Sequence, residues 1–203
     1  MTDSKSIALN TIRAEHRALA LVIDNIKGLI GEIRAERMRM DFPLFWSMIY
    51  YIDAFPDQLH HPKENDWLFS RVKLRTNEAD ALIGELLRQH EHEPVALGTI
   101  RKWLGNYEAG VAGSLEGLEL AVKEFADFSR KHLRTEEHEL LPIAESHLTS
   151  TDWDEIAKAF GENGDPLVGQ HEGEQFIALF REIVDRTPAP LGLGAGVVQN
   201  RVG

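Results

Sequence analysis

Apolar residues along the first part of the chain recur at alternating steps of three and four residues, which is the spacing of one face of an α-helix. A histidine, His16, stands in the middle of this stripe and keeps its spacing. The apolar members of the stripe are Leu9, Ile12, Leu19, Ile23, Ile26 and Ile30. Gly28 and Gly31 weaken the helix near its end, because glycine has a low helix propensity. The pattern predicts a first long helix with one histidine on its buried face.

A second helix is predicted from about Asp41 to about Val72. Asp41 is a good N-cap, and Pro43 is tolerated in a first helical turn, where its missing N–H has no intrahelical partner to lose. Pro56 and Pro62 lie inside this predicted helix. Each proline removes a backbone N–H and collides with the carbonyl four residues earlier, so we expect kinks at both positions.

Two further amphipathic helices are predicted over residues 77–104 and 114–147, with a glycine-rich connection between them. The stripe of the third helix is Leu82, Leu86, His90, Glu93, Leu97, Ile100 and Leu104. The stripe of the fourth helix is Leu118, Val122, Phe125, Ser129, His132, Glu136, Leu140 and Ile143. Each of these stripes therefore also carries a histidine near its middle.

Four long amphipathic helices with short connections predict an all-α fold, an up-down-up-down four-helix bundle with a C-terminal helical extension. We expect the bundle to span residues 1–148. The extension, packed on the bundle, is expected over residues 149–186 and contains a short helix, the turn-rich stretch Gly161–Pro166 and a second helix. Residues 187–203 form a tail that is too rich in glycine and proline for a regular element.

The chain of 203 residues has a formal net charge of -11. Such an acidic chain repels nucleic acid and anionic membranes, so neither is an expected partner. The longest apolar run, residues 42–52, is too short to span a bilayer, which needs about 20 apolar residues. The first residues lack the basic and apolar segments of a signal peptide, so we expect a cytoplasmic protein. The apolar run also leaves a homodimer open as an alternative to a monomer.

Histidine and carboxylate side chains are the candidate chemistry of this chain. The sequence has nine histidines and no cysteine, which excludes disulfides, thiolate zinc sites and iron–sulfur clusters. On a helix, residues i and i+4 lie on the same face, so a His-x-x-x-Glu step presents an imidazole and a carboxylate to one point. Two such steps occur, His60 with Glu64 and His132 with Glu136. Iron and manganese both accept this combination of nitrogen and oxygen ligands.

The position of these steps carries more weight than their number, because chance alone gives roughly one such pair in a chain of this composition. His132 and Glu136 lie in the apolar stripe of the fourth helix, and His60 and Glu64 continue the apolar stretch of the second. All four predicted helices thus point a ligand into one core. A buried, unpaired carboxylate is costly, and a pair of dications supplies the compensating charge. The expected metal ligands are His16, His60, Glu64, His90, His132 and Glu136.

The remaining histidines are assigned by their place relative to the stripes. His61, His138 and His147 fall off the stripes and are expected on the solvated surface. His90 is preferred to His92 as the ligand from the third helix, because only His90 keeps the spacing of the stripe. Taken singly, a histidine in an apolar stripe is more often a satisfied core residue than a ligand, so the prediction depends on the four stripes together.

Four segments of the chain carry a resemblance to a known family. The segments are FPDQLHHPKENDWLFSRV, FSRKHLRTEEHELLPIA, IRAEHRALALVI and LLRQHEHE. They resemble, in that order, the second, fourth, first and third helices of bacterial hemerythrin-like proteins, the HHE cation-binding family. The resemblance extends from residue 7 to about residue 147 and keeps the order His, His-x-x-x-Glu, His, His-x-x-x-Glu.

The resemblance implies a non-haem di-iron centre in which Glu64 and Glu136 bridge two Fe ions. The terminal ligands that it implies are His16, His60, His90 and His132. Oxygen-carrying hemerythrins have a further histidine four residues after the first histidine of the third helix, where this chain has Pro94. Either Glu93 or water is left to fill that place. The difference favours sensing of, or reaction with, a small ligand over simple oxygen carriage.

Three functions remain open from the sequence. The first is a di-iron protein that binds or senses oxygen or a related small ligand, peroxide or nitric oxide. The second is a di-iron enzyme for peroxide or nitric oxide detoxification or for iron–sulfur cluster repair. The third is a metal-free helical interaction module, in which the histidines are core polar groups or a pH switch.

Overall fold

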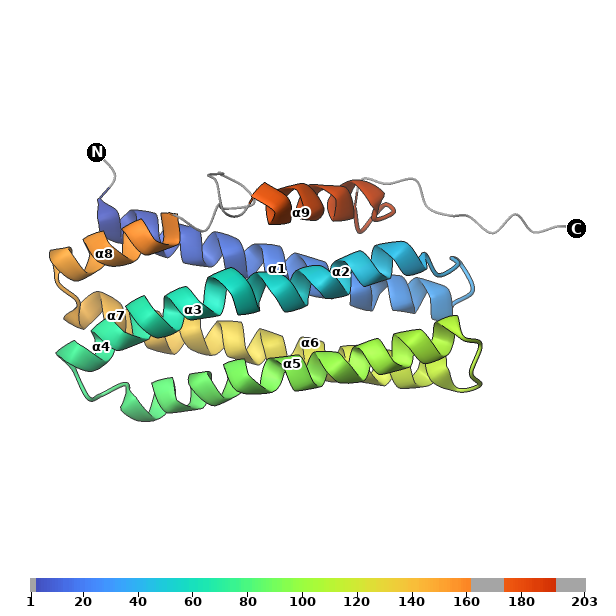
Figure 1. The fold of residues 1–203 in the computed structure, drawn as a ribbon, viewed down its shortest axis with the longest axis horizontal. Coiled ribbons are helices and arrows are strands. Elements are labelled where there is room, and N and C mark those ends of the chain that lie inside the picture. Colours follow the sequence, from blue (N-terminus) through green and yellow to red (C-terminus); the bar gives the residue numbers. More distant parts are fainter. Residues whose placement is uncertain (1–2, 162–173, 193–203) are drawn as a thin grey trace, which may run out of the picture.

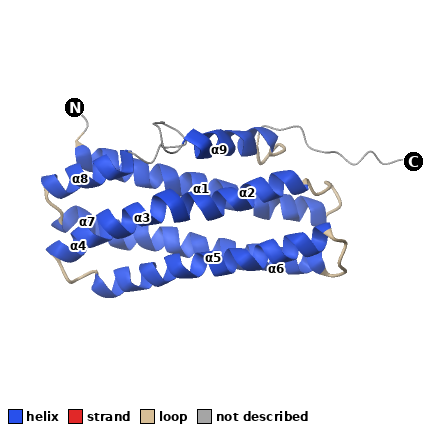
Figure 2. Ribbon diagram, viewed as in Figure 1, coloured by secondary structure: helices blue, strands red, loops and turns tan. Residues whose placement is uncertain are grey.

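The computed structural model describes residues 3–161 and 174–192, and these residues are helical apart from short connections. Four long helical rods lie side by side along the length of the molecule (Figure 1). The predicted all-α architecture is confirmed, and the described ranges contain no strand (Figure 2). The arrangement is compatible with the predicted four-helix bundle.

The first and third rods are uninterrupted α-helices. The first, α1 (Ser4–Arg34), begins after Asp3, whose side chain accepts a hydrogen bond from the backbone N–H of Ser6 (2.7 Å). This bond satisfies one of the N–H groups that a helix start leaves without a partner. The third rod, α5 (Asp80–Glu108), continues through Pro94.

The second and fourth rods alternate between α-helix and π-helical segments, labelled η. The second rod consists of α2 (Phe42–Phe55), η1 (Pro56–His60), α3 (His61–Lys63), η2 (Glu64–Phe69) and α4 (Ser70–Arg75). The fourth rod consists of α6 (Ser114–Thr135), η3 (Glu136–Leu140) and α7 (Leu141–His147). The predicted N-cap at Asp41 is confirmed, because its side chain accepts a hydrogen bond from the N–H of Leu44 (3.0 Å).

Near the prolines where the sequence predicted kinks, the second rod contains π-helical turns. The N–H of His61 donates to the carbonyl of Pro56, five residues earlier, and the next residue, Pro62, has no N–H to donate. The fourth rod repeats this arrangement: the N–H of Leu141 donates to the carbonyl of Glu136, and a proline again follows. A π turn holds one residue more than an α-helical turn, so the side chains after it face a different direction.

Two helices beyond the bundle pack on its outside (Figure 1). α8 (Ser150–Gly161) packs on α1, and α9 (Glu174–Arg186) packs on α2. Near the start of α8, the carboxylate of Asp152 accepts two hydrogen bonds from the guanidinium of Arg75, both of 2.8 Å. This pair ties α8 to the end of the second rod.

Buried apolar side chains form two clusters along the bundle. The larger cluster lies between α1, α2, η1, α5, α6 and α9, and the smaller one between α1, η2, α4, α5, η3, α7 and α8. Along each rod, membership changes from one cluster to the other at the predicted ligands. In α1, for example, Ile12 belongs to the smaller cluster and Leu19 to the larger, with His16 between them. A buried polar layer therefore separates the two clusters.

Two segments predicted towards the C-terminal end lie largely outside the part of the chain that the structure describes. Most of the predicted turn Gly161–Pro166, and residues 193–203 of the predicted tail, lie outside the described residues.

The apolar run 42–52 is largely buried, and Tyr50, 53% exposed, is its most exposed large hydrophobic side chain. None of the described helices is both long and apolar enough to cross a membrane.

Candidate metal centre

The six side chains predicted as ligands come from all four rods and lie together in the buried polar layer. They are His16 from α1, His60 and Glu64 from the second rod, His90 from α5, His132 from α6 and Glu136 from η3. None of them is more than 7% exposed. The structure therefore places every predicted ligand where the sequence analysis expected it, in one core.

The two carboxylates each face histidines on both sides. Glu64 turns Oε1 towards Nε2 of His16 (3.5 Å) and Oε2 towards Nε2 of His90 (3.5 Å). Glu136 does the same, with Oε2 at 3.3 Å from Nε2 of His16 and Oε1 at 3.6 Å from Nε2 of His90. Both glutamates are the first residues of π-helical segments. Each carboxylate thus offers one oxygen to each of two neighbouring positions.

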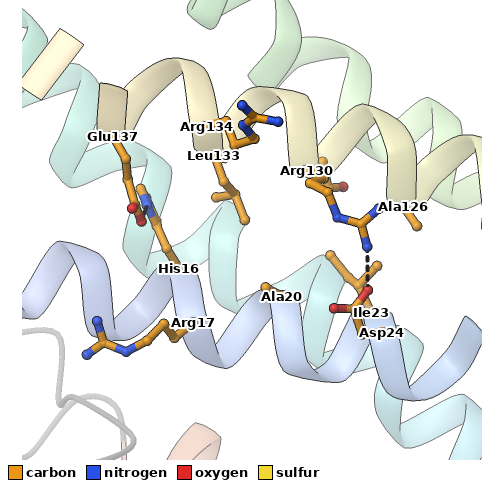
Figure 3. Close-up of a pocket in the computed structure, with 11 residues that line it drawn as sticks. His16, Arg17, Ala20, Ile23, Asp24, Ala126, Arg130, Leu133, Arg134 and Glu137 are labelled. Atoms are coloured by element: carbon orange, nitrogen blue, oxygen red, sulfur yellow. Dashed lines mark hydrogen bonds and ion pairs between the residues drawn. The ribbon is translucent and has the colours of Figure 1, made fainter. Parts of the chain in front are cut away.

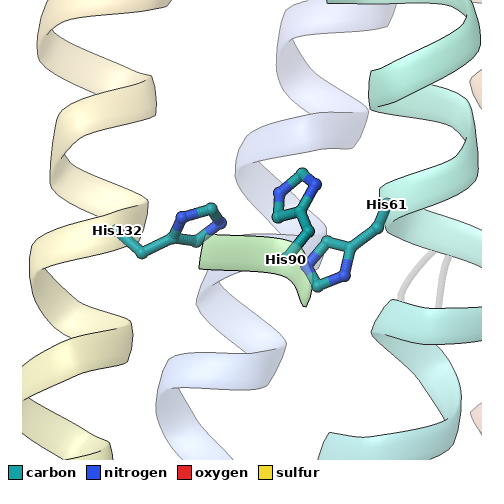
Figure 4. Close-up of side chains that lie close together, drawn as sticks. All are labelled: His61, His90 and His132. Atoms are coloured by element: carbon teal, nitrogen blue, oxygen red, sulfur yellow. The ribbon is translucent and has the colours of Figure 1, made fainter. Parts of the chain in front are cut away.

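The potential ligand atoms fall into two groups, and within each group they all lie within 4.8 Å of one another. The first group comprises His16, His60, Glu64 and Glu136. The second comprises His61, His90 and His132 (Figure 4). We call these the two-histidine position and the three-histidine position.

His61 corrects the sequence analysis, which placed it on the solvated surface. Its side chain is buried, 8% exposed, and its ring stacks on that of His90 with the centroids 3.8 Å apart and the planes at 13°. In a regular α-helix, adjacent residues such as His60 and His61 point about 100° apart. The π turn Pro56–His60 widens the helix at this point, and both rings reach the core. The prolines on either side of the histidine pair are the signal that could have identified it.

The other three histidines of the described ranges are exposed. They are His92, His138 and His147. For His138 and His147 this confirms the sequence prediction. The preference for His90 over His92 agrees with the structure, since His90 lies in the cluster while the ring of His92 packs against Phe128 (5.6 Å between centroids).

Glu93, one of the two candidates for the place left by Pro94, belongs to neither group. Its Oε2 lies 3.5 Å from Nε2 of His61. Burial raises the pKa of Glu93 to about 8, although the charge of His60 acts in the opposite direction. A fifth histidine is present after all, but the second rod supplies it.

Four hydrogen bonds orient the histidines, and each joins two different rods. The pairs are His60 Nδ1 with Glu15 (2.7 Å), His16 Nδ1 with Glu137 (3.0 Å), His90 Nδ1 with Asn65 (3.0 Å) and His132 Nδ1 with Gln89 (2.9 Å). Each acceptor is the neighbour in sequence of a predicted ligand on its own rod. The bonds join the first rod to the second, the second to the third, the third to the fourth and the fourth to the first, and thus form a closed ring around the bundle. A proton on Nδ1 leaves the lone pair on Nε2, as a metal ligand requires. The sequence analysis did not identify these acceptors, and their place beside the ligands is the available signal.

Several buried polar atoms of the cluster have no hydrogen-bond partner within the described residues. They are both carboxylate oxygens of Glu64 and of Glu136, and Nε2 of His90 and of His132. In addition, Nε2 of His16 and Nε2 of His60 face each other at 3.1 Å, and with both protons on Nδ1 these atoms present opposed lone pairs. Buried groups of this kind are costly unless a cation compensates them. Imidazole and carboxylate together suit iron or manganese, so the residues present fit a pair of metal cations.

Residues 7–144, which cover most of the four rods, match the hemerythrin HHE cation-binding domain. The chain belongs to this family. No curated protein and no solved structure matches the sequence of this chain. The resemblance inferred from the sequence is confirmed, and the buried histidines and carboxylates of this hemerythrin domain form its candidate cation site.

The two positions of the hemerythrin domain differ in how strongly their surroundings favour a positive charge, as the pKa shifts of their histidines show. Burial acts to lower the pKa of His60, but the charges and hydrogen bonds of Glu64 and Glu15 outweigh it and raise the pKa to about 10. At the three-histidine position, burial and the neighbouring His90 hold the pKa of His61 well below its usual range. The two-histidine position therefore attracts positive charge more strongly.

A cavity of about 180 Å³ lies between α1 and α6 and reaches His16 (Figure 3). His16 and Glu137 form one end of it, and the ion pair between Arg130 and Asp24 (2.7 Å) forms the other. The rest of the lining combines the apolar side chains of Ala20, Ile23, Ala126 and Leu133 with Ser129, Arg17 and Arg134. The cavity of the hemerythrin domain thus gives a small molecule an approach to the two-histidine position.

Proposed function

We propose that this chain is a non-haem di-iron protein that binds or senses oxygen or a related small ligand such as peroxide or nitric oxide. The observation that carries the proposal is the pair Glu64 and Glu136. Each carboxylate offers one oxygen to each position, and all four oxygens lack hydrogen-bond partners within the described residues. This suits a carboxylate-bridged pair of Fe ions. When bound, the pair supplies redox activity and exchangeable coordination sites.

In this proposal the two positions have different protein ligands. His16 and His60 serve the two-histidine position, while His61, His90 and His132 serve the three-histidine position. The position with fewer protein nitrogens keeps a place for an exogenous ligand. The cavity beside His16 leads to that position. We therefore propose that the small ligand meets the centre on the side of α1 and α6.

The chain's own residues keep this centre dry and rigid. The ring of Phe55 stacks near His60 (6.3 Å between centroids), and that of Phe69 near His90 (5.7 Å). The two apolar clusters lie on either side of the polar layer. Exclusion of water strengthens the electrostatic interactions inside the site and protects a bound small ligand. The proposal takes the four rods as an up-down-up-down bundle, in which the hydrogen-bond ring joins successive rods.

Metal analysis combined with optical spectroscopy tests the proposal. Protein produced with ample iron should contain about two Fe per chain. After anaerobic reduction, exposure to oxygen should produce a visible absorption band. A chain that contains less than about one metal per molecule would instead be the metal-free helical module.

The open cavity beside the two-histidine position also supports a second function, an enzyme for peroxide or nitric oxide detoxification. Steady-state consumption of either compound, above that of free iron and lost in His132→Ala, would favour the enzyme. A band that forms and reverses with oxygen, without turnover, would favour binding or sensing.

A further inference from the structure

His60 packs against aromatic rings that connect it to both helices of the C-terminal extension, α8 and α9. The ring of Phe160 from α8 meets the ring of His60 edge-on, with the centroids 6.3 Å apart and the planes at 77°. The ring of Phe55 from α2 stacks on His60 at 6.3 Å and 21°, and it also meets the ring of Phe176 from α9 edge-on at 5.7 Å. None of these four side chains is more than 1% exposed. His60 therefore contacts α8 directly and α9 through a single ring.

Further contacts hold the same two helices to the second rod beside His60. The ring of Tyr51 stacks on that of Phe55 (5.5 Å between centroids) and also contacts the ring of Phe180 from α9 (5.7 Å). On the side of α8, Nζ of Lys63 donates a hydrogen bond to the carbonyl of Ala159 (3.1 Å). The part of the rod that carries His60 is therefore also the part that receives the extension.

The place of the His60 ring depends on a positive charge at the two-histidine position. Its Nδ1 is bonded to Glu15 (2.7 Å), while its Nε2 faces Nε2 of His16 (3.1 Å) and Oε1 of Glu64 (3.3 Å). A proton on Nε2 bridges His60 to only one of these two groups, whereas a metal cation would attract both. Protein interiors are close-packed, so a buried ring that shifts displaces its neighbours. A shift of His60 without metal would therefore disturb the rings that lead to α8 and α9.

We propose that the packing of α8 and α9 on the bundle is coupled to metal binding at the two-histidine position, through the ring of His60. Phe160 carries the coupling to α8, and Phe55 with Phe176 carries it to α9. Metal binding and packing of the extension stabilise each other, because coupling between two sites is reciprocal. The extension is then the part of the chain that responds to the state of the centre, as a sensor requires. This inference rests on the proposed metal centre.

Hydrogen exchange followed by mass spectrometry tests the coupling. The metal-free full-length protein is measured alone and after anaerobic addition of Fe(II), with bound iron quantified in the same samples. We expect the amides of α8 and α9 to exchange roughly 5- to 150-fold more slowly with Fe(II) bound, which is the ordinary range of coupling between two sites. Residues 101–108, at the end of α5 remote from His90, should slow much less.

Two variants separate the two routes. Phe160→Leu and Phe55→Leu each replace one fully buried ring beside His60 by the same smaller side chain, so each is the matched control of the other. Phe160→Leu should reduce the response of α8 to Fe(II) and leave that of α9 unchanged, and Phe55→Leu should do the reverse. The response is the ratio of the exchange rates without and with Fe(II) in one variant, so a general loss of stability cancels. Circular dichroism establishes that both variants are folded.

Three results would overturn the coupling. The first is exchange of α8 and α9 that does not change when Fe(II) is bound. The second is equal slowing of α8, α9 and residues 101–108, which is the general stabilisation that any bound ligand gives. The third is an unchanged response of both helices in both variants. A chain that binds no Fe(II) would remove the di-iron proposal as well, whereas bound Fe(II) without a response removes the coupling alone.

Discussion

The hydrogen-bond ring around the centre contains acceptors of two chemical kinds. Carboxylates, Glu15 and Glu137, serve the two-histidine position, whereas the amides of Asn65 and Gln89 serve the three-histidine position. A carboxylate that accepts an imidazole N–H adds negative charge and makes the other ring nitrogen a stronger ligand. Glu15 is fully buried, while the side chain of Glu137 is 29% exposed and therefore better screened by water. Glu15 has the larger influence of the two.

This difference predicts a selective effect of Glu15→Gln. We expect the variant to lose about 10- to 100-fold in metal affinity at the two-histidine position, with little change at the other. Anaerobic titration of the metal-free protein with Fe(II) separates the two binding steps. Glu91→Gln, at an exposed position of α5, is the matched control and should titrate like the unaltered protein. Equal weakening of both steps would contradict the assignment.

A second prediction concerns His61. His61→Ala removes one of the three nitrogens of the three-histidine position, so metal content should fall from about two to about one per chain. His92→Ala removes an exposed histidine from α5 and should leave metal content unchanged. Elemental analysis of the two purified variants measures this. Retention of both metals in His61→Ala would show that His61 is only a packing residue.

Residue periodicity was sufficient to predict that His16, His90 and His132 face the core, because each keeps the spacing of an apolar stripe. It did not predict His61, since the rule of 3.6 residues per turn fails at a π turn. Periodicity also did not identify the side chains that accept hydrogen bonds from the histidines, such as Glu15. These side chains point sideways to a neighbouring rod, and that direction depends on how the rods pack rather than on the stripe of one helix.

At the scale of elements, some helix ends follow closely from the sequence, whereas the third helix, predicted over 77–104, is α5 at Asp80–Glu108. Asp41 caps α2 as predicted, and the predicted limits of the fourth rod, 114 and 147, agree with the structure. The start is well determined because Gly113 has a φ of 75°, in the left-handed region that glycine adopts readily. The π segments inside the rods were not predicted, because the count of apolar steps assumes 3.6 residues per turn along the whole of each rod.

Two glycines of neighbouring helices should respond in opposite ways to alanine. A Cβ at Gly117 of α6 would collide with the ring of Trp103 from α5, so Gly117→Ala should lower the free energy of unfolding by about 1–2 kcal/mol. Gly98 of α5 has no neighbour within 4 Å of such a Cβ. Gly98→Ala should therefore raise the free energy of unfolding by about 0.5–1 kcal/mol. Urea denaturation measures both, and a stabilised Gly117→Ala would show that Trp103 moves freely.

At the scale of the whole molecule, α8 completes the smaller apolar cluster with Trp153, Ile156 and Phe160. Its attachment depends on Asp152, which is almost fully buried and accepts hydrogen bonds from Arg75 and from the N–H of Thr149 (2.8 Å). The guanidinium of Arg75 is the largest cause that holds the pKa of Asp152 well below its usual value, against the effect of burial. The extension is thus fixed to the bundle by a charged contact at its first turn.

This contact predicts a pH dependence. Because the folded pKa of Asp152 lies below the unfolded value of about 3.9, its contribution is complete above pH ~4 and is lost as the pH falls further. Asp152→Asn should lower the free energy of unfolding by about 1–3 kcal/mol at neutral pH and should flatten the loss of stability between pH ~4 and ~2. Tryptophan fluorescence during urea unfolding measures both. Asp154→Asn, exposed on the same helix, should change neither.

The π turn Pro56–His60 makes the length of the second rod as important as its composition. Deletion of one residue there, such as the exposed Gln58, would remove the residue that the π turn holds in excess and leave a regular helix, with the later part of the rod facing as it does now. In that regular helix the adjacent His60 and His61 would point about 100° apart, and only one of the two rings would reach the core. Across descendants of a common ancestor, we therefore expect the stretch from Pro56 to His60 to tolerate exchanges of residue but no deletion wherever both histidines reach the centre.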